Sequence, residues 1–292
     1  MQNRFNKIGS ILGIFFLKIL SHFPLFFLYI LADFLYFVFY RLIKYRIKVV
    51  RNNLANSFPE KSKAELLQIE IKFYKYLADL VIETIKSFTI SKRKLLKRMT
   101  FLNTIYVDQL VNDNKSAMVV MGHYGNWEWI CRSAPLFIKN NIIVAYKPLT
   151  NPQFDKLLYQ ARIEFGVRQV PMHQLPRVLL AEKKPYLLIL LADQSPSDSE
   201  SSIWVEFLNQ DTAVLPGIEK LAIKYKLPIY YNEVKLLKRG YYTCEFKPMI
   251  EVTENSKYSE ITQLHSMRLE ENIKSNPTLW LWSHKRWKLK RN

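Results

Sequence analysis

Continuous apolar runs and amphipathic stretches alternate along most of this chain. The apolar runs, which are typical of buried strands, fall at residues 116–122, 141–147, 186–193, 203–208, 228–237 and 241–250. Helical stretches fall between them, at residues 127–139, 151–166, 175–184, 217–226 and 258–277. This alternation predicts an α/β domain with a largely buried sheet flanked by helices. The turn sequence KRGYY, between the last two runs, predicts that the sheet is mixed, with an antiparallel hairpin.

The N-terminal region has a different pattern. FPLFFLYILADFLYFVFY, residues 23–40, contains a single charge and as a helix would measure about 27 Å, close to the thickness of a bilayer's hydrocarbon. Basic residues follow at once in RLIKYRIKVVRNN, which predicts that the rest of the chain lies on the cytoplasmic side. We expect a membrane anchor over residues 1–45 and one globular domain over residues 46–292. A buried core helix, or a helix lying in the membrane interface, remains the alternative.

A long amphipathic helix is predicted after this anchor. Ser62 and Glu65 have the S-x-x-E spacing of a capping box, and apolar side chains recur at helical spacing up to residue 84. The basic segment SKRKLLKRM follows as a short helix or loop.

Charge and cysteine content narrow the possible functions. The chain has 43 Lys and Arg against 25 Asp and Glu, a formal charge of +18, which attracts nucleic acid, anionic lipid or an acidic carrier protein. Nucleic-acid-binding motifs are lacking in the sequence, so we do not expect nucleic acid as a partner. Cys131 and Cys244 stand far apart, which predicts no disulfide, no zinc site and a reducing compartment. Cys131 lies in an apolar stretch and is interpreted as a buried residue rather than a nucleophile.

The candidate chemistry lies in AMVVMGHYGNWEWI, residues 117–130. Gly122 ends a strand, Gly125 permits a tight turn, and Asn126 is a good N-cap for a helix beginning at residue 127. Five positions separate His123 from Glu128, a spacing that would point them apart on one helix. With His123 in the loop and Glu128 in the first helical turn, the carboxylate can reach the imidazole.

A carboxylate bonded to one ring nitrogen makes the other nitrogen a better base. We therefore predict that Glu128 orients His123 as a general base, at the strand end where α/β sheets place their sites. A buried histidine held only for structural reasons is the alternative. No H-E-x-x-H pattern, nucleophile elbow or phosphate-binding loop is present in the sequence.

The segment GHYGNWEW resembles the H-x-x-x-x-D/E block of the lauroyl/myristoyl secondary acyltransferases of lipid A biosynthesis. Further blocks resemble the same family in order along nearly the whole chain: YRIKVVRNNLANSFPEKSKAE, YKPLTNPQFDKLLYQARIEFG, LLADQSP, VEFLNQDTAVLPGIEKLA and NPTLWLWSHKRWK. Two positions depart from it, because Lys147 stands where the family often has Arg, and Leu208–Asn209 stand in place of a Phe–Gly pair. The resemblance implies a glycerol-phosphate-acyltransferase-like mixed sheet.

The resemblance also implies an activity. A membrane-bound O-acyltransferase would move an acyl chain from acyl carrier protein to a hydroxyl of a lipid A precursor, without metal or cofactor. His123 would act as the base, Glu128 would orient it, and backbone amides near residues 125–127 would stabilise the oxyanion. Expected partners are acyl carrier protein, the lipid A precursor and phospholipid, at the cytoplasmic side of the inner membrane.

Several other side chains are candidates for substrate binding. Arg162 suits a phosphate or carboxylate of the acceptor, although on its own it is equally typical of a solvated surface charge. Asp193 and Gln194 follow a strand and are expected to shape the site, with an ordinary Asx turn as the alternative. The remaining candidates are Asn126, Lys147, Asn151, Asp155, His284 and Arg286. An acyltransferase for an aminolipid, glycolipid or pigment, or a non-catalytic lipid-binding membrane protein, remains an alternative function.

Overall fold

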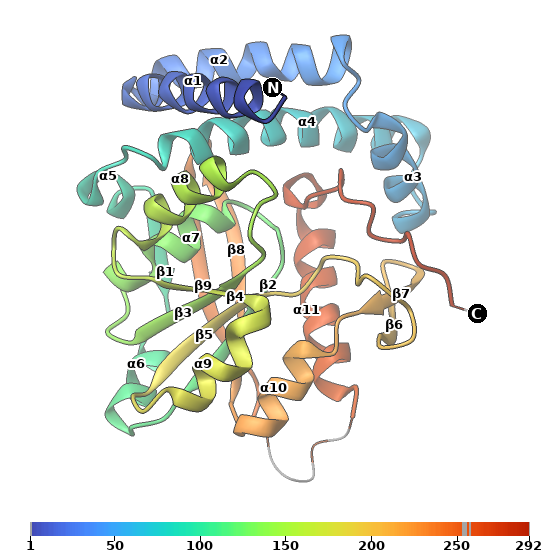
Figure 1. The fold of residues 1–292 in the computed structure, drawn as a ribbon. Helices are drawn as coiled ribbons and strands as arrows, with labels where there is room; N and C mark the ends of the chain where they lie inside the picture. Colours follow the sequence, from blue (N-terminus) through green and yellow to red (C-terminus); the bar gives the residue numbers. More distant parts are fainter. Residues whose placement is uncertain (1, 253–255, 257, 292) are drawn as a thin grey trace.

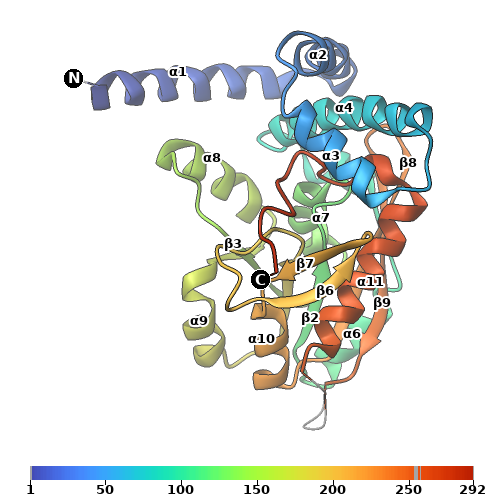
Figure 2. The same ribbon diagram turned by 90° about the vertical axis from the view of Figure 1, so that its right-hand side faces the viewer.

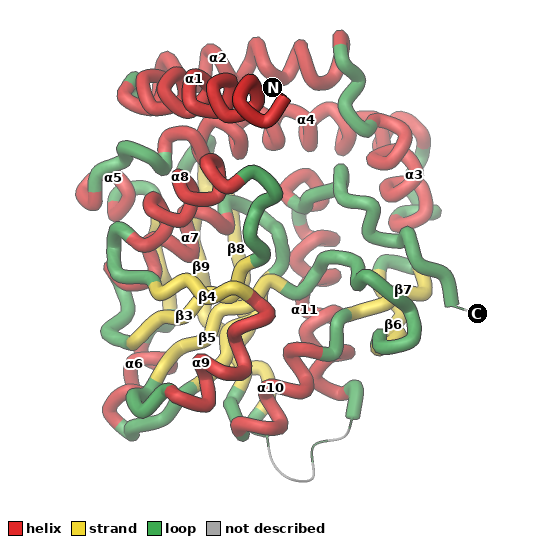
Figure 3. Tube along the Cα trace, in the orientation of Figure 1, coloured by secondary structure: helices red, strands yellow, loops and turns green. Residues whose placement is uncertain are grey.

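The computed structural model describes residues 2–252, 256 and 258–291, and confirms an α/β fold with a mixed sheet flanked by helices (Figures 1 and 3). Seven strands run in the order β1-β9-β8-β2-β5-β3-β4. Their bounds are β1 Met99–Leu102, β2 Ala117–Met121, β3 Asn141–Tyr146, β4 Arg168–Pro171, β5 Tyr186–Leu191, β8 Ile229–Lys238 and β9 Tyr241–Ile250. Within this sheet β8 and β9 pair antiparallel, through a turn in which Gly240 has φ +72°, and the other described neighbours pair parallel. The predicted hairpin is confirmed.

Successive side chains of the central strand β2 point to opposite faces of the sheet and pack into two separate core layers. Ala117, Val119 and Met121 pack with α4 and α7, whereas Met118 and Val120 pack with α9 and α10. The helix bounds are α4 Lys63–Lys86, α5 Lys92–Leu96, α6 Ile105–Asn112, α7 Trp127–Ser133, α8 Pro152–Ile163, α9 Leu175–Ala181, α10 Gly217–Tyr225 and α11 Glu260–Ser275. The capping box of α4 is confirmed, because Ser62 and Glu65 bond each other's backbone N–H.

One predicted strand lies outside the main sheet. β6 (Ile203–Phe207) pairs antiparallel with β7 (Gln210–Val214) as a separate ribbon. The chain then returns through α11 and a 3₁₀ turn at Pro277–Leu279 to a C-terminal segment rich in tryptophan. This segment lies against the loop after β2, where Tyr124 forms a β-bridge with Trp280.

Three N-terminal helices precede α4, namely α1 (Gln2–His22), α2 (Leu25–Phe37), which continues as a π-helical turn over Val38–Leu42, and α3 (Ile47–Ser57). α1 and α2 lie on the outer side of α4, away from the sheet, whereas α3 lies beside one end of α4 (Figures 1 and 2). By length and composition, the helix over Leu25–Leu42 is apolar enough to cross a membrane. Leu25, Leu28 and Ala32 are nevertheless buried against the rest of the protein.

Candidate active site

His123 is held by a carboxylate from another strand. Its Nδ1 lies 2.6 Å from Oδ1 of Asp193, and its backbone N–H donates to Oδ2 of the same carboxylate at 2.8 Å. Trp280 donates its indole N–H to Oδ2 at 2.7 Å. Asp193 is buried, with 5% of its surface exposed, whereas the imidazole is partly open. Three contacts to one buried carboxylate fix the position of the His123 ring.

Strand register explains why these two residues meet. β2 and β5 are parallel neighbours, with Met121 opposite Leu191 at their carboxyl ends. His123 and Asp193 each stand two residues beyond that last pair, so both enter the same edge of the sheet. The Ala192 N–H donates to the Met121 carbonyl at 3.0 Å and extends the pairing into the loop.

The hydrogen bonds of the pair fix which ring nitrogen of His123 faces Asp193. Burial alone would raise the pKa of Asp193, but the His123 charge and the hydrogen bonds from His123 and Trp280 lower that pKa to about 2. Asp193 is therefore ionised and can only accept hydrogen bonds, so the Nδ1–H of His123 donates to it. The Nε2 of His123 points away from the carboxylate and lies 3.3 Å from the side-chain amide nitrogen of Gln194. In a neutral ring with Nδ1 protonated, this nitrogen carries the lone pair.

Glu128 does not take the position that the sequence predicted. Its two carboxylate oxygens accept hydrogen bonds from Arg162, at 2.7 Å from Nε and 2.5 Å from Nη2. The predicted bond from Glu128 to His123 is therefore wrong, because Asp193 holds Nδ1 and Arg162 holds Glu128 in a two-pronged ion pair. The pKa of Arg162 is lowered by burial, but the charge and hydrogen bonds of Glu128 outweigh this and raise it.

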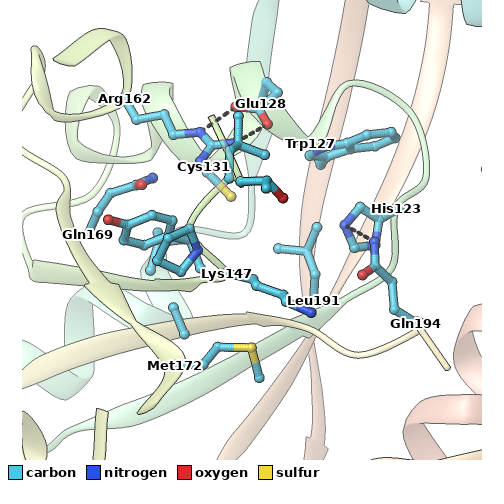
Figure 4. A pocket seen from close by; sticks show the side chains of 16 residues that line it. His123, Trp127, Glu128, Cys131, Lys147, Arg162, Gln169, Met172, Leu191 and Gln194 are labelled. Carbon is cyan, nitrogen blue, oxygen red and sulfur yellow. Dashed lines mark hydrogen bonds and ion pairs between the residues drawn. The ribbon is translucent and has the colours of Figure 1, made fainter. Parts of the chain in front are cut away.

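A cleft of about 430 Å³ joins the two pairs, and this volume is within the range of ligand sites. Figure 4 shows Glu128 and Arg162 on one wall and His123 and Gln194 on another. Lys147, from the end of β3, also lines the cleft and is exposed, with no carboxylate partner within the described part of the chain. The other lining residues are Trp127, Cys131, Val144, Ala145, Tyr146, Pro148, Leu149, Thr150, Gln169, Met172 and Leu191.

Cys131 lines this cleft but is a poor nucleophile. Its side chain is buried, and burial raises the pKa of its thiol to about 12, so the thiolate is rare at neutral pH. Among the described residues, no group of three or more His, Cys, Asp or Glu is placed to hold a metal ion.

The loop between His123 and α7 is built as the sequence suggested. Gly125 has φ +61°, and a Cβ there would stand 2.6 Å from a methyl carbon of Val234, so both conformation and space require glycine. Asn126 caps α7 by accepting the Trp129 N–H, which places Glu128 in the first turn. The Gly125 N–H already donates to the Leu279 carbonyl. Of the predicted oxyanion donors, only the amides of Asn126 and Trp127 therefore remain candidates.

Glu83 on α4 also supports this loop, and sequence reasoning missed it. This fully buried carboxylate accepts hydrogen bonds from Tyr29, Asn126 and Tyr242, at 2.7, 2.6 and 2.9 Å. Tyr76, also on α4, donates to the Gly125 carbonyl at 2.7 Å. Burial raises the pKa of Glu83 to about 7, although its three donors act in the opposite direction. Nothing in the local sequence sets Glu83 apart from the other acidic residues of α4.

We expect Glu83→Gln to change how stability depends on pH. A pKa of about 7 in the folded state exceeds the unfolded value of about 4.3, so the folded protein holds more protons between these values. Its free energy of unfolding therefore falls as pH rises through that window, by about 4 kcal/mol. Glutamine does not titrate, so between pH 5 and 8 the Tm of the wild type should fall relative to that of the variant. Parallel Tm curves, as expected for exposed Glu60→Gln, would contradict this.

Asn151 and Asp155 shape the cleft from outside its lining. Asn151 caps α8 and also donates to Ser10 of α1 at 2.9 Å. Asp155 accepts the Leu149 N–H at 2.8 Å, which fixes the loop that carries Lys147. Both residues therefore position the wall of the cleft.

Arg286 is buried and His284 is half-buried. His284 Nε2 accepts the Ser195 N–H at 3.0 Å, and burial lowers the pKa of His284 to about 4, so the ring is neutral. Arg286 is 3% exposed and donates to the Ala213 carbonyl at 2.7 Å, while burial lowers its pKa to about 10. The predicted contact of Arg286 with substrate is thus wrong, because its guanidinium is buried. His284 instead holds the loop after Asp193.

Two comparisons bear on this site. A sequence model of the family described as "Bacterial lipid A biosynthesis acyltransferase" matches residues 3–289. A curated relative from Haemophilus influenzae, "Lipid A biosynthesis acyltransferase", is 23% identical over 283 residues. The alignment covers 94% of this chain and 86% of the relative.

Proposed function

Since the chain belongs to the bacterial lipid A biosynthesis acyltransferase family, we propose that it transfers a fatty acyl chain from acyl carrier protein to a hydroxyl of a lipid A precursor. The observation that carries the proposal is the His123–Asp193 pair at the edge of a cleft lined with cations. The family is one of acyl transfer in lipid A synthesis. The donor, the residue roles and the location at the inner membrane are part of the proposal.

In the proposed reaction His123 is the general base. Its Nε2 accepts the proton of the acceptor hydroxyl while Asp193 holds Nδ1–H and stabilises the imidazolium that forms. The oxygen attacks the thioester carbonyl carbon and forms the new C–O bond. The tetrahedral oxyanion receives hydrogen bonds from the amides at the start of α7. The C–S bond then breaks, and the carrier's thiol leaves with the proton returned by His123.

The cations in the cleft are proposed to bind the anionic acceptor. The Nε and Nη2 of Arg162 face Glu128, so Glu128 fixes the guanidinium and leaves Nη1 for substrate. Lys147, which is exposed and lines the same cleft, supplies a second positive charge. Both suit a phosphorylated sugar, and the net charge of +18 favours an acidic carrier and an anionic membrane.

The proposal is tested with purified protein, acyl carrier protein loaded with a fatty acid, and a lipid A precursor, with the product measured by mass spectrometry. We expect acylated product from the wild type and at least a 10³-fold slower rate from His123→Ala, the loss expected when a general base is removed. His173→Ala, at an exposed histidine outside the cleft, is the matched control and should be unaffected. Acyl coenzyme A replaces the loaded carrier in a second arm to identify the donor. A wild-type rate from His123→Ala would refute the role of His123.

A further inference from the structure

The N-terminal helices α1 and α2 each expose a stripe of apolar side chains. α1 presents residues at positions 11, 12, 15, 16 and 19, and α2 presents positions 26, 27, 30, 34 and 37, while position 23 is exposed in the turn between the two helices. We call these residues, with Leu42 and Ile43, the hairpin surface. Their exposed fractions range from 47% to 71%: Ile11, Leu12, Phe15, Phe16, Ile19, Phe23, Phe26, Phe27, Ile30, Phe34, Phe37, Leu42 and Ile43.

The opposite side of α2 is fastened to α4 at both ends. Tyr29 donates to Glu83 at 2.7 Å, and Tyr40, just beyond α2, donates to Glu70 at 2.8 Å. Glu70 and Glu83 are thirteen positions apart, about 20 Å along α4. The order of the two contacts means that α2 runs antiparallel to α4 over this whole length, as Figure 1 shows.

A charged cluster fastens the middle of α2. Arg239, from the β8–β9 turn, binds Asp33 of α2 at 2.7 Å and Asp79 of α4 at 2.5 Å. The α1–α2 turn is held as well, because Lys86 donates to the carbonyls of Ser21 and Phe23 at 2.7 and 2.9 Å. These contacts join α2 to the same helix that supports the His123 loop.

These contacts are incompatible with a helix that crosses the bilayer. If α2 stood across the hydrocarbon, α4 and its exposed Lys72 and Lys75, together with Arg239, would enter the hydrocarbon beside it. Charged groups at that depth are costly. We infer that α1 and α2 lie in the plane of one leaflet, with the hairpin surface inserted among the acyl chains of an anionic membrane, and that neither helix spans it.

The charges near the hairpin surface identify the kind of membrane. Residues 1–59 contain eight Lys and Arg and a single acidic residue, Asp33, which is paired with Arg239. Lys18 within α1, and Arg41, Lys44, Arg46 and Lys48 after α2, are exposed and follow closely in sequence on the residues of the hairpin surface. Apolar insertion ringed by basic side chains is the pattern of an interfacial helix on anionic lipid. This inference deepens the membrane association of the proposed function, and its tests need no acyl transfer.

The position of the turn between α1 and α2 distinguishes helices that lie in the membrane plane from helices that span it. His22→Cys places a thiol at the exposed turn, and Lys48→Cys places one in α3, while the native Cys131 and Cys244 are buried. A membrane-impermeant maleimide is applied to inverted inner-membrane vesicles and to spheroplasts. In-plane helices predict that both thiols react in the inverted vesicles and neither in the spheroplasts. The inference would be overturned if His22→Cys reacted only in spheroplasts, because the turn would then lie on the far side of the membrane. It would also be overturned if His22→Cys reacted in neither preparation while Lys48→Cys reacted, because the turn would then be buried in the bilayer.

A second experiment measures flotation of the protein with vesicles made either of phosphatidylcholine alone or of phosphatidylcholine with one fifth phosphatidylglycerol, an anionic lipid. We expect Phe26→Gln/Phe34→Gln to lower flotation with the anionic vesicles at least tenfold, because both side chains belong to the hairpin surface. The matched control Leu180→Gln/Met267→Gln alters two exposed apolar residues elsewhere and should float like the wild type. Equal flotation of all three proteins would refute the proposed surface, and equal binding to both vesicle types would refute the preference for anionic lipid.

Discussion

Asp193→Asn is expected to lower kcat by about 10³–10⁴ while leaving the protein folded. Oδ2 of Asp193 accepts two N–H donors, from the His123 backbone and the Trp280 indole. An asparagine must therefore place its amide oxygen at that position and turn its NH₂ group toward Nδ1. The imidazole is then forced to carry its proton on Nε2, where it cannot accept one from the hydroxyl.

The measurement is a single-turnover rate with saturating loaded carrier, together with a thermal unfolding curve. Asp198→Asn is the matched control, since Asp198 is an exposed carboxylate five residues further along the same loop. A rate for Asp193→Asn within tenfold of the wild type would show that Asp193 does not set the tautomer of His123.

Glu128→Ala is expected to reduce kcat/KM by about 10²-fold, mainly through a higher KM for the acceptor. Removing the carboxylate leaves a mostly buried guanidinium without its partner, which typically costs about 3 kcal/mol. Arg162 would then move away from the position in which it lines the cleft.

A double variant tests whether Glu128 positions Arg162 or instead orients His123. If Glu128 acts only through Arg162, then Glu128→Ala/Arg162→Ala should be no slower than Arg162→Ala alone, because without the guanidinium the carboxylate has nothing left to position. A loss in kcat as large as that of Asp193→Asn, with KM unchanged, would instead favour the contact with His123 that the sequence first suggested.

The local sequence predicted local structure well. The loop position of His123, the Asn126 cap and the first-turn position of Glu128 all depend on residues within a few positions of one another. Short elements escaped prediction, including the four- and five-residue strands β1, β4 and β7 and the eight-residue helix α6, because so few residues carry too little periodicity. The function class came from a resemblance that covers nearly the whole chain, and the family match confirms it.

The pairing of site residues could not be predicted in the same way. Asp193 was identified only as a residue after a strand, since the sequence does not state that β2 and β5 are neighbours. Glu128 was the nearest carboxylate in sequence and was therefore assigned to His123. Strand order brings a carboxylate seventy positions away closer to the imidazole than one five positions away. Glu83 was missed for a similar reason, because only tertiary packing surrounds it with three donors.

The contacts between the His123 loop and the C-terminal segment bear on when activity arises during synthesis. Leu279 accepts the Gly125 N–H, Leu281 donates to the His123 carbonyl, and Trp280 binds Asp193. A ribosome makes these three residues after every other element of the site. A nascent chain that already contains His123, Asp193 and both N-terminal helices would therefore lack an aligned base.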